Sequence, residues 1–103
     1  MKQITSVELQ DKIQKGDTFL LDLFATWCGP CRVLLKNLEN LSSSDQKLPM
    51  EIYSFDIDSD RDLVMELGLR SVPTVKIFKD GKEVYSKPGV QSVEQIKSLM
   101  ESF

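Results

Sequence analysis

The sequence contains no histidine and only two cysteines, and both shortages restrict its chemistry. Without histidine there is neither an imidazole base nor an imidazole metal ligand. No apolar run approaches the roughly 20 residues that a membrane-spanning helix needs. The 13 Lys and Arg against 16 Asp and Glu leave a net charge of −3, so no basic excess can release counterions from nucleic-acid phosphates. We therefore expect neither a nucleic-acid partner nor a membrane partner.

The length of 103 residues fits one domain, because two independent cores would each be undersized. We expect a single domain over residues 1–103 and a monomer. Residues 1–10 lack the apolar segment of a secretory signal, which favours a cytoplasmic location. Cytosolic thiols are kept reduced, so two cysteines three positions apart indicate redox or metal chemistry there, not a structural disulfide.

Hydrophobic spacing, helix caps and turn residues predict alternating helices and strands. The predicted elements are a helix from Thr5 to Gly16, a strand over 19–24, a helix over 31–41, a loop over 42–47, a strand over 52–57, a short helix capped by Ser59 that stops at Gly68, a hairpin of strands 74–78 and 83–85 turning at Asp80-Gly81, and a last helix capped by Ser92. The nearly continuous apolar run 19–24 suits a strand covered on both faces, as in parallel sheets. The sequence therefore predicts an α/β fold with one mixed sheet and helices on both faces.

The two cysteines lie in Trp27-Cys28-Gly29-Pro30-Cys31, where the apolar strand ends and a helix begins. With Cys28 as the N-cap, Pro30 is tolerated in the first turn, because the amide it lacks would have had no partner. The Cys31 amide then points at the Cys28 sulfur. The helix N-terminus favours a thiolate, which lowers the pKa of the Cys28 thiol. Helical spacing turns Cys31 toward the core, so we expect an exposed attacking Cys28 and a sheltered resolving Cys31.

The segment Trp27-Cys28-Gly29-Pro30-Cys31 after a buried strand, with Val72-Pro73-Thr74 later, resembles the thioredoxin family over essentially the whole chain. The resemblance implies the thioredoxin fold, with about five strands and about four helices. It implies a protein-disulfide reductase in which the Cys28 thiolate attacks a substrate disulfide and Cys31 resolves the mixed disulfide. The implied partners are disulfide-containing proteins and, as electron donor, an NADPH-linked flavoprotein like thioredoxin reductase. No bound cofactor is expected.

Asp22 is a carboxylate inside the apolar strand, so burial should raise its pKa. Six residues before Cys28, it matches the buried aspartate of thioredoxins. The resemblance implies a general base that helps to deprotonate Cys31, either directly or through water. The lysine that often accompanies this aspartate in the family is replaced here by Ser54, which leads us to expect a higher pKa for Asp22 than in relatives with the lysine.

The resemblance also implies a substrate-contacting surface around the cysteines. Its residues are Trp27, Gly29, Pro30, Val72, Pro73 and Gly89. The implied Val72–Pro73 bond is cis and leaves the Val72 backbone free to pair with an extended substrate segment. Gly89 matches a glycine that lets the substrate backbone approach. Lys36 departs from the helix-kinking proline of many thioredoxins, so we expect a straighter helix with the same chemistry.

Two alternatives to a reductase stay open. Structural zinc takes four ligands, so a metal or iron–sulfur site would need a dimer that shares both cysteine pairs. The other alternative is a non-catalytic subunit that uses the fold to hold a partner. The direction of exchange depends on the redox potential, although Gly-Pro between the cysteines resembles reducing members. The acidic run Asp56, Asp58, Asp60 and Asp62 lacks the glycine and final glutamate of an EF-hand loop, which favours a solvated helix start.

Overall fold

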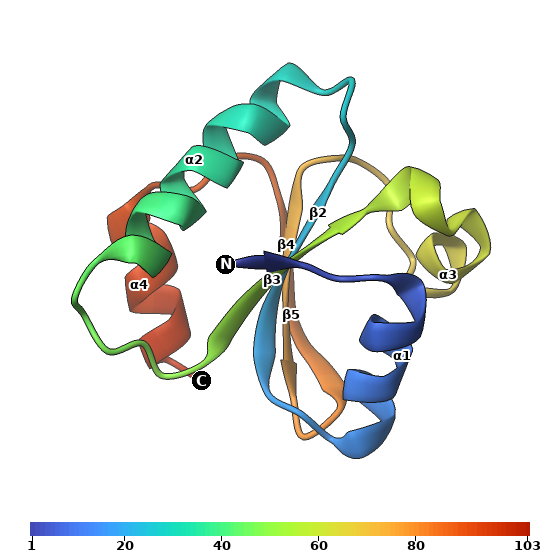
Figure 1. Cartoon of the computed structure of the whole chain (residues 1–103), viewed down its shortest axis with the longest axis horizontal. Helices are drawn as coiled ribbons and strands as arrows, with labels where there is room; N and C mark the ends of the chain where they lie inside the picture. Colours follow the sequence, from blue (N-terminus) through green and yellow to red (C-terminus); the bar gives the residue numbers. More distant parts are fainter.

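The computed structural model describes residues 1–103, with one five-stranded sheet lying between two pairs of helices (Figure 1). The strands are β1 (Lys2–Gln3), β2 (Phe19–Phe24), β3 (Glu51–Asp56), β4 (Thr74–Lys79) and β5 (Lys82–Pro88). The helices are α1 (Ser6–Lys15), α2 (Gly29–Ser43), α3 (Arg61–Glu66) and α4 (Val93–Glu101), with a short 3-10 turn η1 (Ile57–Ser59) before α3. No helix is both long and apolar enough to span a bilayer.

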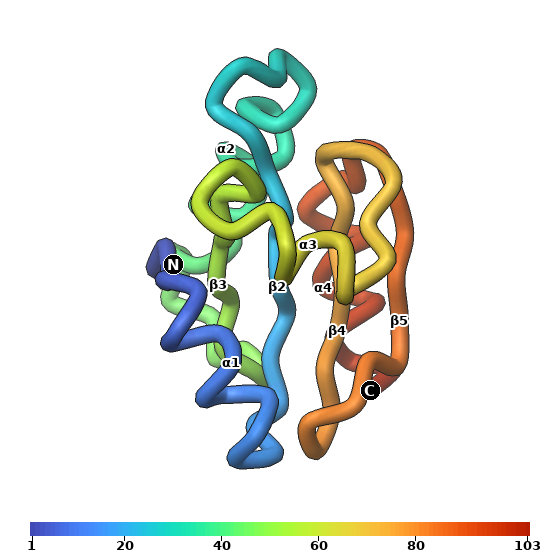
Figure 2. The backbone as a smooth tube through the Cα atoms, turned by 90° about the vertical axis from the view of Figure 1, so that its right-hand side faces the viewer, coloured from blue at the N-terminus to red at the C-terminus, as the bar shows by residue number.

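The strands are ordered β1-β3-β2-β4-β5 across the sheet, and the four longer ones lie side by side in Figure 2. β3 pairs in parallel with β1 and β2, whereas β4 runs antiparallel to both β2 and β5. The predicted mixed sheet with helices on both faces is therefore confirmed. The parallel half holds β2, whose carboxyl end leads directly into the cysteine-containing turn.

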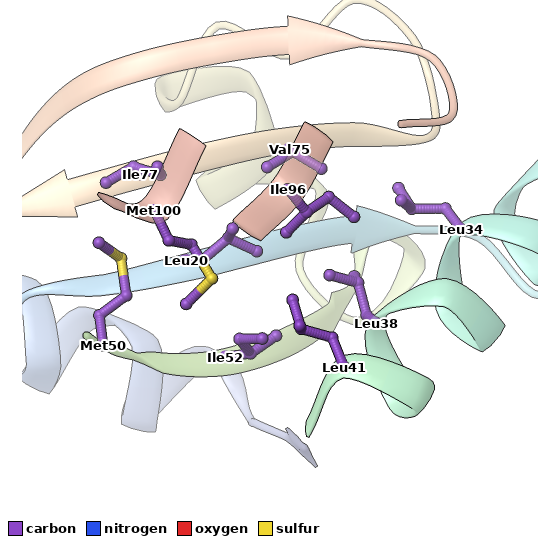
Figure 3. Packing of buried hydrophobic residues seen from close by; sticks show 10 residues of the cluster. All are labelled: Leu20, Leu34, Leu38, Leu41, Met50, Ile52, Val75, Ile77, Ile96 and Met100. Atoms are coloured by element: carbon purple, nitrogen blue, oxygen red, sulfur yellow. The ribbon is translucent and has the colours of Figure 1, made fainter. Parts of the chain in front are cut away.

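β2 is buried along its whole length, which accounts for its uninterrupted apolar sequence. Alternate side chains point to opposite faces. Leu20 packs under α2 and α4, within a cluster of ten buried residues drawn in Figure 3. Leu21 and Leu23 pack on the other face in a cluster with residues of α1 and α3. Each face of the central strand thus has its own core layer.

The first and last helices begin at capping boxes. The Thr5 hydroxyl accepts a hydrogen bond from the Glu8 amide at 3.2 Å, and the Glu8 carboxylate accepts one from the Thr5 amide at 3.0 Å. Ser92 and Gln95 repeat the arrangement at the start of α4. These reciprocal bonds satisfy amides that have no partner inside the helix. Both predicted helix starts are confirmed.

The predicted cap of the third helix is wrong. Asp60, not Ser59, is the N-cap of α3, and its carboxylate accepts a hydrogen bond from the Leu63 amide at 3.0 Å. Ser59 lies in η1 instead, where its hydroxyl donates to the carbonyl oxygen of Asp56 at 2.6 Å. A carboxylate is the stronger acceptor for a helix N-terminus, because it also interacts favourably with the helix dipole.

Element ends also differ from the sequence prediction. α2 begins at Gly29 and extends through Ser43, so it takes in two residues of the predicted loop 42–47. β3 covers Glu51–Asp56, and β5 continues to Pro88. The two-residue strand β1 was not predicted, because Lys2 and Gln3 are polar and exposed and carry no apolar alternation.

The hairpin between β4 and β5 turns where Asp80 and Gly81 both have positive φ, 54° and 79°. Two positive φ values in a two-residue loop fit the twist of the flanking strands, and Asp-Gly favours that turn. Farther along the hairpin, the register shifts between Ile77 and Phe78, so Val84 of β5 has no partner on β4. This β-bulge changes which β5 side chains share a face.

Candidate active site

The cysteine pair lies where β2 ends and α2 begins. Cys28 is the N-cap of α2, and the Cys31 amide donates a hydrogen bond to Cys28 Sγ at 3.3 Å. Pro30 occupies the first turn, where no intrahelical amide partner is needed. Cys28 and Cys31 are joined in a disulfide, with their Cα atoms 5.3 Å apart. The structure therefore represents the oxidised protein, and the predicted N-cap position of Cys28 is confirmed.

The predicted exposure of Cys28 is wrong. Cys28 is only 6% exposed and Cys31 2%, so both are buried and Cys28 is only slightly the more accessible. Cys28 packs in a small cluster with Phe24 and Ala25, and Val72 covers it from a distant part of the chain. The carbonyl oxygen of Val72 lies 3.8 Å from Cys28 Sγ. The N-terminus of α2, at the carboxyl end of the central strand β2, positions the sulfur, and the loop before β4 contributes to its burial through Val72.

Asp22 lies on the face of β2 that α2 covers, because it alternates with Leu20 and Phe24. The side chain is fully buried, and neither carboxylate oxygen has a hydrogen-bond partner. Desolvation by burial raises the pKa of Asp22 to about 7. The expected upward direction is thus confirmed. Ser54 is its parallel partner on β3 and is also buried, so no cation from that strand position offsets the burial.

Trp27 is 67% exposed beside the cysteines. Its indole Nε1–H donates to the Asp58 carboxylate at 3.0 Å, and Asp58 also accepts from Arg61 at 3.2 Å. The ring borders a largely apolar cavity of about 370 Å³, here called the apolar cavity. Its lining residues are Trp27, Ile57, Val64, Leu69, Arg70, Ser71 and Val72. An exposed aromatic held by a hydrogen bond next to an apolar hollow suits contact with another protein.

The loop before β4 forms the other wall of the site. The Val72–Pro73 bond is cis, as expected, and Pro73 is buried just before the interior strand β4. The Gly89 amide donates to the carbonyl oxygen of Pro73 at 2.9 Å. Gly89 has φ 96° and no atom within 4 Å of the position that a Cβ would take, so the surface there is open. Gly29 and Pro30, beside Cys28 in the chain, are exposed as well.

Some neighbours of the site could not be anticipated from the sequence. Asp58 was interpreted only as part of a solvated helix start, and nothing in its local pattern indicates its bond to Trp27, 31 residues away. A further cavity of about 230 Å³ reaches Cys31 and is lined by Phe24, Ala25, Thr26, Cys31, Arg32 and Leu35. No group of three or more potential metal ligands gathers anywhere in the chain; the two cysteines are bonded to each other instead.

The chain is similar to known proteins along nearly its whole length. The Thioredoxin family model matches residues 1–102. A thioredoxin of Chlamydia muridarum is 38% identical over 102 residues, which cover 97% of this chain and 96% of that protein. Among solved structures, a mutant thioredoxin of Halobacterium salinarum gives a TM-score of 0.82 at 33% identity, covering 100% of this chain and 88% of the other. Plasmodium falciparum thioredoxin gives 0.84 at 28% identity, covering 100% and 99%.

Proposed function

The chain belongs to the thioredoxin family and is a protein-disulfide oxidoreductase, and we propose that Cys28 is its nucleophile, Cys31 its resolving thiol and Asp22 its proton acceptor. The observation that carries this assignment is the Cys31 amide donating to Cys28 Sγ at the N-terminus of α2. The same amide and the helix dipole stabilise negative charge on Cys28 once the disulfide is reduced. Cys31 lies deeper and has no such donor.

Two exchanges make up the proposed reaction. The Cys28 thiolate attacks one sulfur of a substrate disulfide, forms a mixed disulfide and releases the other substrate sulfur as a thiolate that takes up a proton. Cys31 then loses its proton and attacks Cys28 Sγ, which releases the second substrate thiol. The substrate gains two electrons and two protons, and the enzyme keeps the Cys28–Cys31 disulfide.

We propose that Asp22 accepts the Cys31 proton during the second exchange. It lies under α2, whose buried face carries Cys31, and a pKa of about 7 lets it bind or release a proton near neutral pH. A base with a pKa near the working pH combines a useful ionised fraction with enough basicity. A bridging water molecule would relay the proton across any separation between the two groups.

Substrate proteins are proposed to bind in an extended conformation across the surface formed by Trp27, Gly29, Pro30, Val72 and Gly89. The Val72 backbone is next to Cys28 Sγ, and strand-like pairing there would present a substrate disulfide to the nucleophile. Pro73 fixes the loop that carries Val72. The apolar cavity beside Trp27 would take an apolar side chain of the bound segment.

A reductase must recover its dithiol after each turnover. We assign the electron donor to an NADPH-linked flavoprotein of the thioredoxin-reductase type, by analogy with the family. Reduction as the net direction requires a compartment that keeps thiols reduced, which in cells is the cytoplasm. The enzyme is proposed to work there as a monomer.

Turnover of insulin disulfides with dithiothreitol tests the assignment. Cys28→Ser should abolish catalysis, whereas Cys31→Ser should accumulate a mixed disulfide that mass spectrometry detects. Asp22→Asn should slow turnover most above pH 7, where the wild-type carboxylate is ionised. Val33→Ala, at an exposed position of α2, is the control and should turn over normally. Undiminished turnover by Cys28→Ser would contradict the assignment of the nucleophile.

A further inference from the structure

A polar cavity of about 160 Å³ adjoins the apolar one. We call it the polar cavity; its lining residues are Gly68, Leu69, Arg70, Ser71, Thr74, Lys76, Ser86 and Pro88. Leu69, Arg70 and Ser71 line both cavities, so the two hollows share a wall. The chain between α3 and β4 lies alongside the end of β5 at this point (Figure 2). None of the residue roles proposed above uses the polar cavity.

Lys76 is the unusual residue of the polar cavity, because its side chain is only 3% exposed although it carries a charge. Its ammonium donates to Glu83 Oε1 at 2.6 Å and to Ser86 Oγ at 3.1 Å. An ammonium has three protons to donate, so one remains without a partner. The β-bulge at Val84 allows both bonds, since it turns Glu83 and Ser86 to the same face as Lys76.

The remaining groups of the polar cavity also favour an anion. Arg70 is exposed and takes part in no ion pair, and no Asp or Glu is among the lining residues. Ser86 accepts from Lys76, so its own proton stays free to donate, whereas Thr74 already donates to the Ser71 carbonyl oxygen at 2.7 Å. Because Glu83 compensates the charge of Lys76, Arg70 is the one uncompensated cation of the polar cavity, in a chain with net charge −3. A carboxylate accepts several hydrogen bonds and offers none, which complements that lining.

The position of the polar cavity points to the substrate as the source of the carboxylate. Ser71 and Thr74 flank Val72 and Pro73, and the Val72 carbonyl oxygen lies 3.8 Å from Cys28 Sγ. An extended segment advances about 3.3 Å per residue, so a side chain a few residues from the substrate cysteine can reach this hollow. Lys76 lies on the α1 and α3 face of the sheet, opposite Asp22, and is therefore separate from the proton-transfer group.

We propose that the polar cavity receives a carboxylate side chain of the substrate protein, so that the enzyme prefers disulfides flanked at one position by Asp or Glu. Lys76 and Arg70 are then specificity-determining residues, and Glu83 holds the Lys76 ammonium in place. The proposal rests on the proposed function, since it assumes that substrates bind across Val72. It assigns a chemical class to the residue that accompanies the target cysteine.

Disulfide-bonded peptides test the preference directly. One glutamate is moved through successive positions on either side of the target cysteine, and each peptide is compared with its glutamine counterpart at low ionic strength. At one position we expect kcat/KM for the glutamate peptide to exceed that for the glutamine peptide by about three- to tenfold, the range of a partly exposed, charge-assisted contact. The advantage should shrink with added salt.

Variants link the preference to the polar cavity. Arg70→Gln and Lys76→Met should each reduce the glutamate advantage, while Glu83→Gln should enlarge it by freeing the Lys76 ammonium. Lys79→Gln removes an exposed charge from the same strand outside the cavity and should leave the advantage unchanged. Arg70 is exposed and takes part in no ion pair, so Arg70→Gln should fold normally. This variant therefore tests the proposal even if Lys76→Met fails to fold.

Three results would overturn the proposal: no position with a glutamate advantage, an equal advantage at every position, or an advantage that Lys79→Gln removes as strongly as Arg70→Gln. An equal advantage would show long-range attraction without a site. Turnover of the glutamine peptides separates this proposal from the proposed function. Loss of turnover with both peptides in the wild type would contradict the reductase assignment itself, whereas turnover without preference contradicts only the acidic subsite.

Discussion

At the residue scale, Asp22 shows how burial converts an ordinary carboxylate into a group that titrates near neutral pH. Its two oxygens lack partners, and desolvation raises its pKa from 3.8 to about 7. The sequence predicted this direction, because a charged residue inside an apolar strand must be desolvated. The partner on β3, Ser54, carries no charge that would reverse the shift.

Asp22→Asn should raise the stability of the oxidised protein at alkaline pH. Asp22 binds its proton more tightly in the folded state than in the unfolded chain. Its protonation therefore contributes to the free energy of unfolding fully below pH 3.8, and this contribution is lost as the pH rises to about 7. The loss amounts to at most about 4 kcal/mol. Urea unfolding should show that the variant has a higher free energy of unfolding than the wild type mainly at pH 8, and much less so at pH 4. An equal change at both pH values would show that titration of Asp22 is not responsible.

The accessibility of Cys28 marks the limit of reasoning from the local sequence. The strand end, Pro30 and the three-residue spacing were enough to predict the N-cap and its hydrogen bond from Cys31. Part of the low exposure of Cys28 comes from packing against Val72, which is 44 residues away. Likewise, no local pattern indicates that Asp58 holds Trp27. Contacts between distant segments depend on the assembled sheet.

At the element scale, caps and turns were predicted where the residues satisfy backbone groups locally. The two capping boxes and the Asp80-Gly81 turn are of this kind. The choice of Asp60 over Ser59 was not predicted, because both are good caps and η1 occupies Ser59. The short strand β1 depends on its parallel pairing with β3, which no local pattern in the sequence indicates.

Gly81→Ala should destabilise the hairpin severely, because a Cβ at Gly81 would lie 2.5 Å from the carbonyl oxygen of Ile13. Gly68→Ala is the matched control, since Gly68 also has positive φ but open space around it. Gly68→Ala should lower the free energy of unfolding by about 1–2 kcal/mol, because its backbone is left-handed. Gly81→Ala should lower the free energy of unfolding by about 1–3 kcal/mol more, because the new Cβ would force the backbone at Ile13 to move. Chemical denaturation measures both, and equal losses would mean that the contact with α1 is unimportant.

At the scale of the whole molecule, the sheet separates two core layers with different roles. The layer under α2 and α4 supports the cysteines and Asp22, and the layer under α1 and α3 borders the polar cavity through Lys76. The alternation of elements along the sequence was sufficient to predict a mixed sheet covered on both faces. The strand order β1-β3-β2-β4-β5 was not predicted, since strand pairing is a property of the assembled sheet.

Leu38→Ala should test how far α2 depends on its core layer. Leu38 is fully buried in the cluster of Figure 3, so truncation should lower the free energy of unfolding by about 2–5 kcal/mol. Val33→Ala, 55% exposed on the same helix, should change it by less than about 0.5 kcal/mol. Thermal or urea unfolding of both variants measures the difference. A small loss for Leu38→Ala would mean that α2 is held mainly by other contacts.

The central claim is that the N-terminus of α2 makes Cys28 the reactive thiol. Alkylation of the fully reduced protein by iodoacetamide over a range of pH, with each cysteine identified by peptide mapping, tests it most directly. The account predicts that Cys28 is modified first and that its rate reaches half-maximum below the roughly pH 8.5 of a free cysteine. Faster modification of Cys31, or a Cys28 profile like that of an unstructured peptide, would contradict it.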